Sequence, residues 1–300
     1  MKHALLAAIS LFLSMGSAWA EPPRVATDIA PVQSLTAMVM GDLGTPGAIL
    51  PPGASPHDHA LRPSEATALT QADIVFWIGP ELTPWLDHAL GTLAGKAQVV
   101  RLLTHPDTAR LPLRDGPVFD GRDADSTNPT IPDPHAWLNP GNAITWIRII
   151  AANLAVFDPD NAATYSANAA RAENRITNLA TDIRRQLSDV KAPGFLAYHD
   201  SYQYFEHAFQ TPALGAILSG EAERPSPGRM LALADLVANS DVDCVLAEPG
   251  TDTRLATALF KGISPRIALA DPIGSTLTPG PDLYPNLLQS LADALLSCDQ

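Results

Sequence analysis

Residues 161–190, NAATYSANAARAENRITNLATDIRRQLSDV, run for thirty residues without Gly or Pro. In the second half of this stretch the apolar residues recur every three or four positions, the spacing of one buried helix face: Ile176, Leu179, Ile183 and Leu187. Asp158-Pro159 stands before the stretch and Pro193-Gly194 after it, and both pairs are typical of helix boundaries. The pattern therefore predicts one long helix that separates two other parts of the chain.

Both of those parts alternate β-rich apolar runs with amphipathic segments, the order that predicts parallel α/β sheets. In the first part we expect strands at 24–29, 48–50, 73–78 and 98–103, and helices at 31–42, 63–71, 81–93 and 142–157. In the second part we expect strands at 195–198, 214–218, 244–247 and 266–270, and helices at 202–209, 227–239, 254–261 and 284–296. The acidic segment 115–133, rich in Asp, Gly and Pro, predicts an exposed loop.

The predicted fold class is α/β, with two parallel-sheet α/β domains joined by a single long helix and a cleft between them. We expect an N-terminal domain at 21–158, the linking helix at 159–191 and a C-terminal domain at 192–300. In open parallel sheets, ligands bind beyond the carboxyl ends of the strands. The cleft is therefore the expected place for a binding site.

Residues 1–20 predict a secretory signal peptide. A short basic start, Met1-Lys2-His3, precedes an apolar run, and Ala18-Trp19-Ala20 fits a small-x-small cleavage pattern. The apolar run has about 12 residues, fewer than the roughly 20 that a membrane-spanning helix needs. No Cys lies near the cleavage site, so we expect no lipid anchor. The mature chain is then an exported, soluble protein of 280 residues with a net charge of −14.

The composition excludes several classes of protein. Lys and Arg number 19 against 32 Asp and Glu, which gives the full chain a net charge of −13. Nucleic-acid-binding proteins need a basic stripe that neutralises phosphates, and membrane-surface domains need a polybasic patch. We therefore expect neither nucleic acid nor a membrane surface as a partner.

The two cysteines, Cys244 and Cys298, predict one disulfide in an exported protein. Cys244 lies in an expected core strand and Cys298 close to the C-terminus, so the bond would fix the tail to the core. Loop closure over 54 residues gives about 4 kcal/mol as an upper figure for the stabilisation. The alternative, a pair of metal thiolates, lacks the close spacing of a soft-metal site.

Several histidines and one aspartate stand where expected strands end. His57 and His59 follow the strand at 48–50, His199 follows that at 195–198, Asp271 follows that at 266–270, and His135 closes the acidic loop. Three imidazoles and a carboxylate converging on the cleft would suit Zn²⁺, and Mn²⁺ if further oxygen ligands joined. Side chains two residues apart in an extended chain point to opposite sides, so we expect only one of His57 and His59 at the metal. The spacing does not decide which.

These segments resemble the cluster A-I metal-binding proteins of ABC importers. The resemblance rests on Gly53-Ala54-Ser55-Pro56-His57-Asp58-His59, Asp133-Pro134-His135-Ala136-Trp137-Leu138, Tyr198-His199-Asp200-Ser201-Tyr202, Ala247-Glu248-Pro249 and Asp271-Pro272-Ile273-Gly274, which occur in the order of the family. A histidine at position 199 and the pair Cys244/Cys298 make the chain most similar to the zinc-uptake branch. One departure is that segment 115–133 has no His, whereas many members of this branch carry a His-rich loop there.

The resemblance implies a periplasmic solute-binding protein, not an enzyme, that binds zinc tightly and delivers it to a membrane permease. The implied ligands are His57, His135 and His199, with Asp271 or water in the fourth position. A periplasmic metallochaperone is a further candidate partner, and a monomer with modest domain adjustment on binding is expected. The alternatives are a manganese-binding member of the same family, a metal-dependent adhesin, and a secreted zinc hydrolase with Glu248, Glu206 or Glu223 as its general base.

Overall fold

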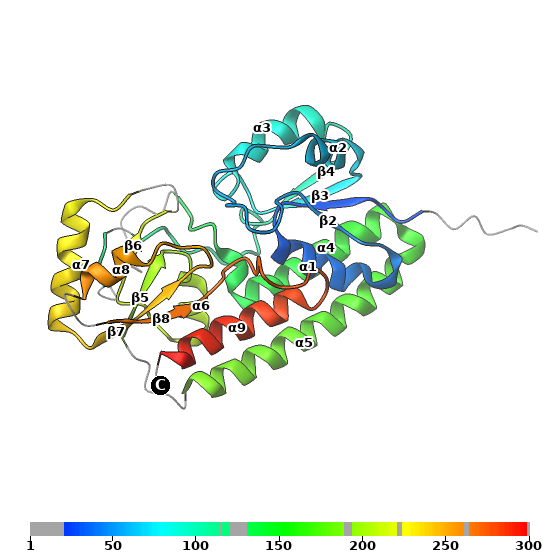
Figure 1. The fold of residues 1–300 in the computed structure, drawn as a ribbon. Helices are drawn as coiled ribbons and strands as arrows, with labels where there is room; N and C mark the ends of the chain where they lie inside the picture. The colour runs from blue at the N-terminus through cyan, green and yellow to red at the C-terminus, as the bar shows by residue number, and fades with distance from the viewer. Residues whose placement is uncertain are drawn as a thin grey trace, which may run out of the picture.

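The computed structural model describes residues 21–114, 116–119, 131–188, 194–220, 224–260 and 264–298. The expected signal peptide at 1–20 and most of the acidic loop, residues 115 and 120–130, lie outside this range. The described residues form two four-stranded parallel sheets with flanking helices (Figure 1). The predicted fold class is confirmed.

The first sheet has the strand order β2-β1-β3-β4. Its strands are β1 (Val25–Thr27), β2 (Gly47–Ala48), β3 (Ile74–Trp77) and β4 (Gln98–Arg101). All four residues of β3 are buried, as expected for a strand with helices on both faces. Helices α2 (Pro63–Gln71) and α3 (Pro84–Leu93) cover one face, and α1 (Ala30–Met40) and α4 (Pro140–Phe157) lie on the other. Short 3-10 turns follow α1, precede α4 and follow α4: η1 (Gly41–Leu43), η3 (Ala136–Leu138) and η4 (Pro159–Asn161).

The second sheet repeats this plan with the order β6-β5-β7-β8. Its strands are β5 (Gly194–His199), β6 (Gly215–Leu218), β7 (Val242–Ala247) and β8 (Arg266–Leu269). Helices α7 (Pro227–Asn239) and α8 (Arg254–Leu259) pack on one face, and α6 (Gln203–Phe209) and α9 (Leu283–Ser297) on the other. Because every strand is parallel, the carboxyl ends of each sheet meet at one edge.

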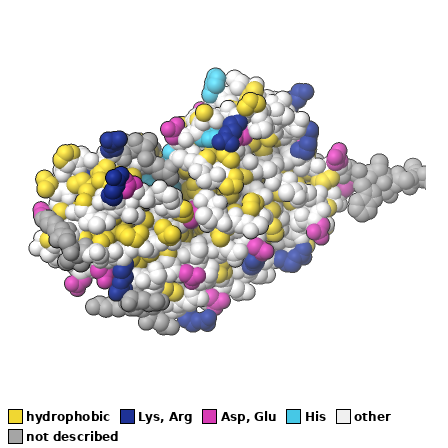
Figure 2. All heavy atoms as spheres, in the orientation of Figure 1, with side chains coloured by type: hydrophobic (Ala, Val, Ile, Leu, Met, Phe, Trp, Pro, Cys, Tyr) yellow, Lys and Arg dark blue, Asp and Glu magenta, His cyan; other side chains and the backbone are white. Residues whose placement is uncertain are grey.

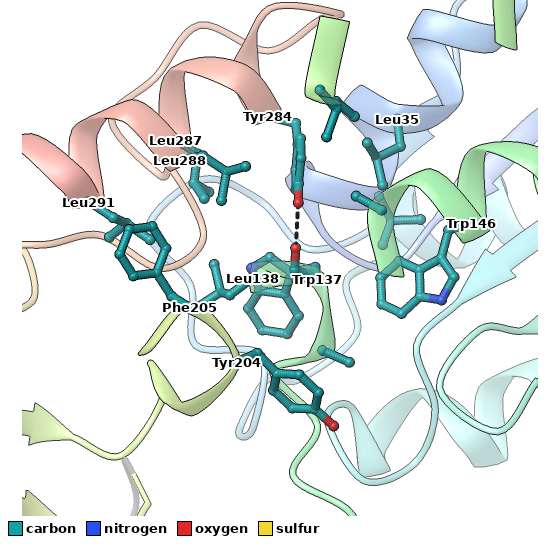
Figure 3. Packing of buried hydrophobic residues seen from close by; sticks show 14 of the residues in the cluster. Leu35, Trp137, Leu138, Trp146, Tyr204, Phe205, Tyr284, Leu287, Leu288 and Leu291 are labelled. Carbon is teal, nitrogen blue, oxygen red and sulfur yellow. Dashed lines mark hydrogen bonds between the residues drawn. The ribbon is translucent and has the colours of Figure 1, made fainter. Parts of the chain in front are cut away.

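The long helix α5 (Ala162–Ser188) contacts both α4 and α9, and α9 also packs against α1. In Figure 1, α5 and α9 run beside each other below both sheets. One continuous apolar cluster joins the two parts of the chain through these helices. Within it Tyr284 of α9 donates its hydroxyl proton to the Trp137 carbonyl (2.7 Å), close to the site described below (Figure 3).

The predicted disulfide is confirmed. Cys244 of β7 is bonded to Cys298 at the end of α9, and both residues are fully buried. Arg266 of β8 donates to the Cys298 carbonyl (2.6 Å), so the last turn of α9 is held to the second sheet by a covalent bond and a hydrogen bond.

Among the described residues, no helix has the length and apolar character needed to cross a bilayer. On the face shown in Figure 2, the Lys and Arg side chains stand apart and do not form one basic stripe.

Candidate metal centre

Three histidines meet between the two sheets. His57 lies in the loop after β2, His135 lies just before η3, and His199 is the last residue of β5. Each offers one ring nitrogen to a group whose atoms all lie within 4.8 Å of one another. The ring centroids are 5.2 to 5.6 Å apart. Imidazole nitrogens bind Zn²⁺ at about 2.0–2.1 Å, so this spacing suits one ion placed among the three rings.

The structure separates His57 from His59. The His59 Nε2 atom lies 2.9 Å from Glu65 Oε2, in the first turn of α2, and the His59 ring meets the Trp85 ring edge-on at 4.9 Å. The same Glu65 oxygen accepts the Arg62 backbone N–H (2.7 Å), which caps α2. His59 is therefore part of the helix cap, while His57 joins the other two histidines.

A buried carboxylate orients His135. Asp133 Oδ1 lies 2.7 Å from His135 Nδ1 and accepts the His135 backbone N–H at 2.9 Å. The Gln203 amide, turned so that its nitrogen faces Asp133, donates to Oδ2 (2.9 Å). With its Nδ1 proton donated to Asp133, the imidazole has the Nε2 lone pair left for a metal.

Burial dominates the electrostatics of this pair. It raises the pKa of Asp133 to about 7, although the His135 backbone N–H and the Arg114 charge lower it. Burial also lowers the pKa of His135 well below 6.5, and the nearby His199 lowers it further. His135 therefore stays neutral at a pH below the range in which histidines usually titrate. A metal ligand requires this neutral form.

A second carboxylate lies behind His199. Glu248, the residue after β7, places Oε1 3.2 Å from His199 Nδ1. Glu248 is more exposed than Asp133, with 17% of its side chain accessible. Two of the three histidines therefore have carboxylate partners at Nδ1. Neither carboxylate was predicted as a histidine partner from the sequence. Two features pointed to them: Asp133 stands two residues before His135, and Glu248 follows a strand that pairs with β5.

Asp271 lies near the histidines but outside their group. It borders a cavity of about 380 Å³ that His199 and Glu248 also line. Its Oδ1 accepts the backbone N–H groups of Ile273 (3.1 Å) and Gly274 (2.9 Å), and its Oδ2 accepts from the Ser275 hydroxyl (2.8 Å). In this conformation the carboxylate holds its own turn together.

Hydrogen bonds from aromatic side chains brace the loops that carry the histidines. The Trp85 indole donates to Pro56 O (2.8 Å), directly before His57. Tyr204 donates to Asp133 O (3.0 Å), and the Trp137 indole donates to Pro272 O (2.7 Å). The three-histidine group is thus fixed from both halves of the molecule, as a preorganised metal site requires.

Two parallel α/β units joined by a long helix, with three imidazoles facing each other between them, are the features of a two-part binding protein with a candidate nitrogen-rich metal site. The chain belongs to the family described as "Zinc-uptake complex component A periplasmic", whose model matches residues 25–298.

Named relatives agree with this membership. The chain is 37% identical to the high-affinity zinc uptake system protein ZnuA of Paracoccus denitrificans, covering 98% of this chain and 97% of that protein. It is 31% identical to the protein of the same name from Brucella abortus, covering 99% and 98%. Among solved structures, a crystal structure of ZnuA matches the fold with a TM-score of 0.78 at 21% identity, over 93% of this chain and 100% of that one.

Proposed function

We propose that this protein captures Zn²⁺ in the periplasm and delivers it to the membrane permease of an ABC importer. The observation that carries the proposal is the group of three histidines with ring nitrogens within 4.8 Å of one another. Membership in a zinc-uptake family and the names of full-length relatives support zinc as the cargo. Zinc is bound and released unchanged, so the proposed role is transport and not catalysis.

The proposed ligands are His57, His135 and His199. Three imidazoles favour Zn²⁺ over Mn²⁺, which prefers more oxygen ligands. Asp133 behind His135 supports the proposal, because ligating histidines usually donate their second ring N–H to a carboxylate or carbonyl oxygen. The buried environment supports tight binding, since water competes less for the ion.

For the fourth position we propose Asp271 or a water molecule. Asp271 Oδ2 accepts from the Ser275 hydroxyl (2.8 Å) and from the Thr276 N–H (3.3 Å), so a metal at Oδ2 would compete with these two bonds. Oδ1 could keep its two bonds to the turn. Asp271→Ala distinguishes the two: zinc affinity falls sharply if the carboxylate is a ligand, and by only a few-fold if water fills the position.

The zinc-hydrolase alternative has little support in the described residues. Glu206 is buried against Arg114, and Glu248 is hydrogen-bonded to His199. Glu223, the third candidate base, lies outside the described residues. Turnover of an ester or peptide by the zinc-loaded protein would favour that alternative.

The test is a competition titration of the mature protein with zinc, with metal analysis of the complex. We expect one zinc per chain, and a loss of affinity of at least about 100-fold in His199→Ala, because one of the three imidazole ligands is removed. His59→Gln is the matched control: it retains a donor for Glu65 and should bind zinc like the wild type. High-affinity 1:1 binding that survives the loss of His199 would contradict the proposal.

A further inference from the structure

Between β4 and α4 the chain leaves the first sheet and returns as two paired limbs. The Leu113 backbone N–H donates to Ile131 O (3.1 Å), and the Asp133 N–H donates to Leu111 O (2.8 Å). The returning limb ends at Asp133, the carboxylate that orients His135. The position of the outgoing limb is therefore coupled to that of one metal ligand.

Beyond these limbs, residues 116–119 lie against the second sheet. The Phe119 N–H donates to Leu214 O (2.9 Å), and the Ala216 N–H donates to Pro117 O (3.0 Å). Since β6 is an edge strand, these bonds give it a short antiparallel neighbour supplied by the first part of the chain. The segment thus crosses from one half of the molecule to the other.

Arg114 fixes this crossing with a buried ion-pair network. Its guanidinium donates to both carboxylate oxygens of Asp200 and to both carboxylate oxygens of Glu206. The bond from Arg114 Nη1 to Glu206 Oε2 is 2.7 Å long. The side chains of Arg114 and Glu206 are 6% and 5% exposed, and the guanidinium carbon lies 3.8 Å from the centre of the Phe119 ring. We call Arg114 together with residues 116–119 the strap.

The strap reaches the second metal ligand through Asp200, which directly follows His199. Asp200 is itself held by a backbone bond to Leu218 O (3.1 Å), and the Ser201 N–H donates to His199 O (2.8 Å). A shift of the Asp200 carboxylate would therefore move the end of β5, where the His199 ring is attached.

We propose that the strap is a positioning device that holds His135 and His199 at metal-binding distance before the ion arrives and slows its release afterwards. Arg114 is the central positioning residue, because it lies between the limb that leads to His135 and the loop that follows His199. The proposal rests on the proposed function and deepens it by assigning the rate of zinc release to residues that do not touch the ion.

The ion-pair network of Arg114, Asp200 and Glu206 is suited to positioning more than to stabilising the fold. Buried ion pairs contribute little net stability, because the cost of removing the charges from water offsets their attraction. They are strongly directional, however, since a guanidinium satisfies two carboxylates only in a fixed fork geometry. The network therefore restricts where Asp200 can lie more than it stabilises the fold. Preorganised ligands release a metal slowly, because the ligand side chains have few other conformations to which they could move away from the ion.

Two variants disturb the strap independently. Arg114→Lys keeps the charge but loses the fork, so Asp200 and Glu206 cannot both be paired in the same geometry. Gly215→Ala, in β6, leaves Arg114 intact, but its Cβ would lie 2.4 Å from Pro117 O and 3.0 Å from Leu233 Cδ2, so the strap and β6 must separate. Leu154→Ala is the control, because it opens a buried cavity near the end of α4 and changes no residue of the strap or of its hydrogen bonds.

The experiment measures zinc release from the mature protein by stopped-flow transfer to a chelator, together with the visible spectrum of the Co²⁺ form. Both strap variants should release zinc at least about 10-fold faster than the wild type, the lower end of the effect of residues behind a metal ligand. Their Co²⁺ spectra should also change, because the ligand geometry relaxes. Leu154→Ala should lower the melting temperature and leave both readouts unchanged.

Hydrogen exchange reports on the strap without any metal. In the wild type, the Phe119 and Ala216 amides should be protected, and Gly215→Ala should expose both. Unprotected amides in the wild type, release rates unchanged in both strap variants, or an equal acceleration in Leu154→Ala would overturn the proposal. A wild type that binds no zinc or Co²⁺ would instead contradict the proposed function, so the two failures are distinguishable.

Discussion

At the scale of single residues, carboxylates set the orientation of the histidines. Asp133 and Glu248 lie at the Nδ1 atoms of His135 and His199, and in His135 this leaves Nε2 to face the other rings. Glu65 has the opposite effect on His59, because it holds that ring in the cap of α2. Neighbouring carboxylates therefore orient two of the three clustered histidines, His135 and His199, and hold His59 in the cap of α2.

Asp133→Asn should weaken zinc binding by about 10- to 100-fold, the usual effect of losing the charged partner of a metal-bound histidine. The Asn side chain keeps the size of Asp133 but removes the charge that increases the basicity of His135. A competition titration of the variant measures the loss. Glu248→Gln is a useful comparison and should have a smaller effect, because this contact is longer and more exposed. Wild-type affinity in Asp133→Asn would show that the charge of Asp133 does not support zinc binding.

Zinc affinity should fall as the pH is lowered, because protons compete with zinc for the imidazole nitrogens. Burial holds the pKa of His135 below 6.5, so this residue begins to compete only under more acidic conditions. Each histidine that gains a proton reduces the affinity by about tenfold per pH unit below its pKa. Titrations from pH 7.5 down to pH 4.5 measure the slope. Equal affinity over the whole of this range would contradict histidine ligands.

Residue types at strand ends predicted converging histidines, and the family resemblance supplied the set His57, His135 and His199, but neither supplied the surroundings of that set. The choice between His57 and His59 could not come from spacing, because it depends on Glu65 reaching back from the next helix. The role of Arg114 could not be predicted from the sequence, where it is a lone basic residue at the start of an acidic loop. Its role depends on Asp200 and Glu206, which are more than eighty residues away in the sequence.

At the scale of helices and strands, the Cys244–Cys298 disulfide is the clearest structural link. It joins β7 to the end of α9, and helix α9 also contacts α1, α5 and β8. The bond therefore fixes the second sheet to a helix that also packs against the first part of the chain. Cys244 lies in the middle of β7, whereas Glu248 follows its carboxyl end. The disulfide and the candidate metal centre therefore lie at different positions along this strand.

Replacing both cysteines by Ala should reduce the free energy of unfolding by up to about 4 kcal/mol, because the unfolded chain regains the entropy of a 54-residue loop. Chemical denaturation of the metal-free variant measures this change. Zinc affinity should stay within a few-fold of the wild type, since neither cysteine lies near a histidine of the site. A large loss of affinity with unchanged stability would contradict this division of roles.

The elements themselves were largely predictable. Helices α2 and α7 have the bounds that the sequence predicted, 63–71 and 227–239. Strand ends differ by one or two residues, as in β1 and β8, because the last residues of an apolar run can lie beyond the paired segment. The packing of α9 against α1 and α5 was not predicted, because an amphipathic helix shows which face is apolar but not which partner covers it.

At the scale of the whole molecule, several connections among the described residues join the two sheets. The long helix α5, the C-terminal helix α9 and the strap all link them, and one apolar cluster is continuous through the helices. Sugar-binding proteins with a few extended crossovers close like a hinge, and such closure would require this shared core to break. We therefore expect zinc to be bound with modest local adjustment.

Small-angle scattering tests this expectation. The radius of gyration of the mature protein should be the same within error with and without zinc, because α5 and α9 keep the distance between the sheets. Thermal stability should nevertheless rise with zinc concentration, since the ion binds only the folded chain. A clear compaction on zinc binding would show that the two halves rotate as rigid bodies.

The central claim, that three imidazoles of this chain bind zinc, is tested most directly by X-ray absorption spectroscopy of the zinc-loaded mature protein. The account predicts a four-coordinate zinc with imidazole nitrogens at about 2.0–2.1 Å, in a number consistent with His57, His135 and His199. His59→Gln should give the same spectrum, and His135→Ala should lose one imidazole. A six-coordinate shell of oxygen ligands with no imidazole scattering would contradict the account.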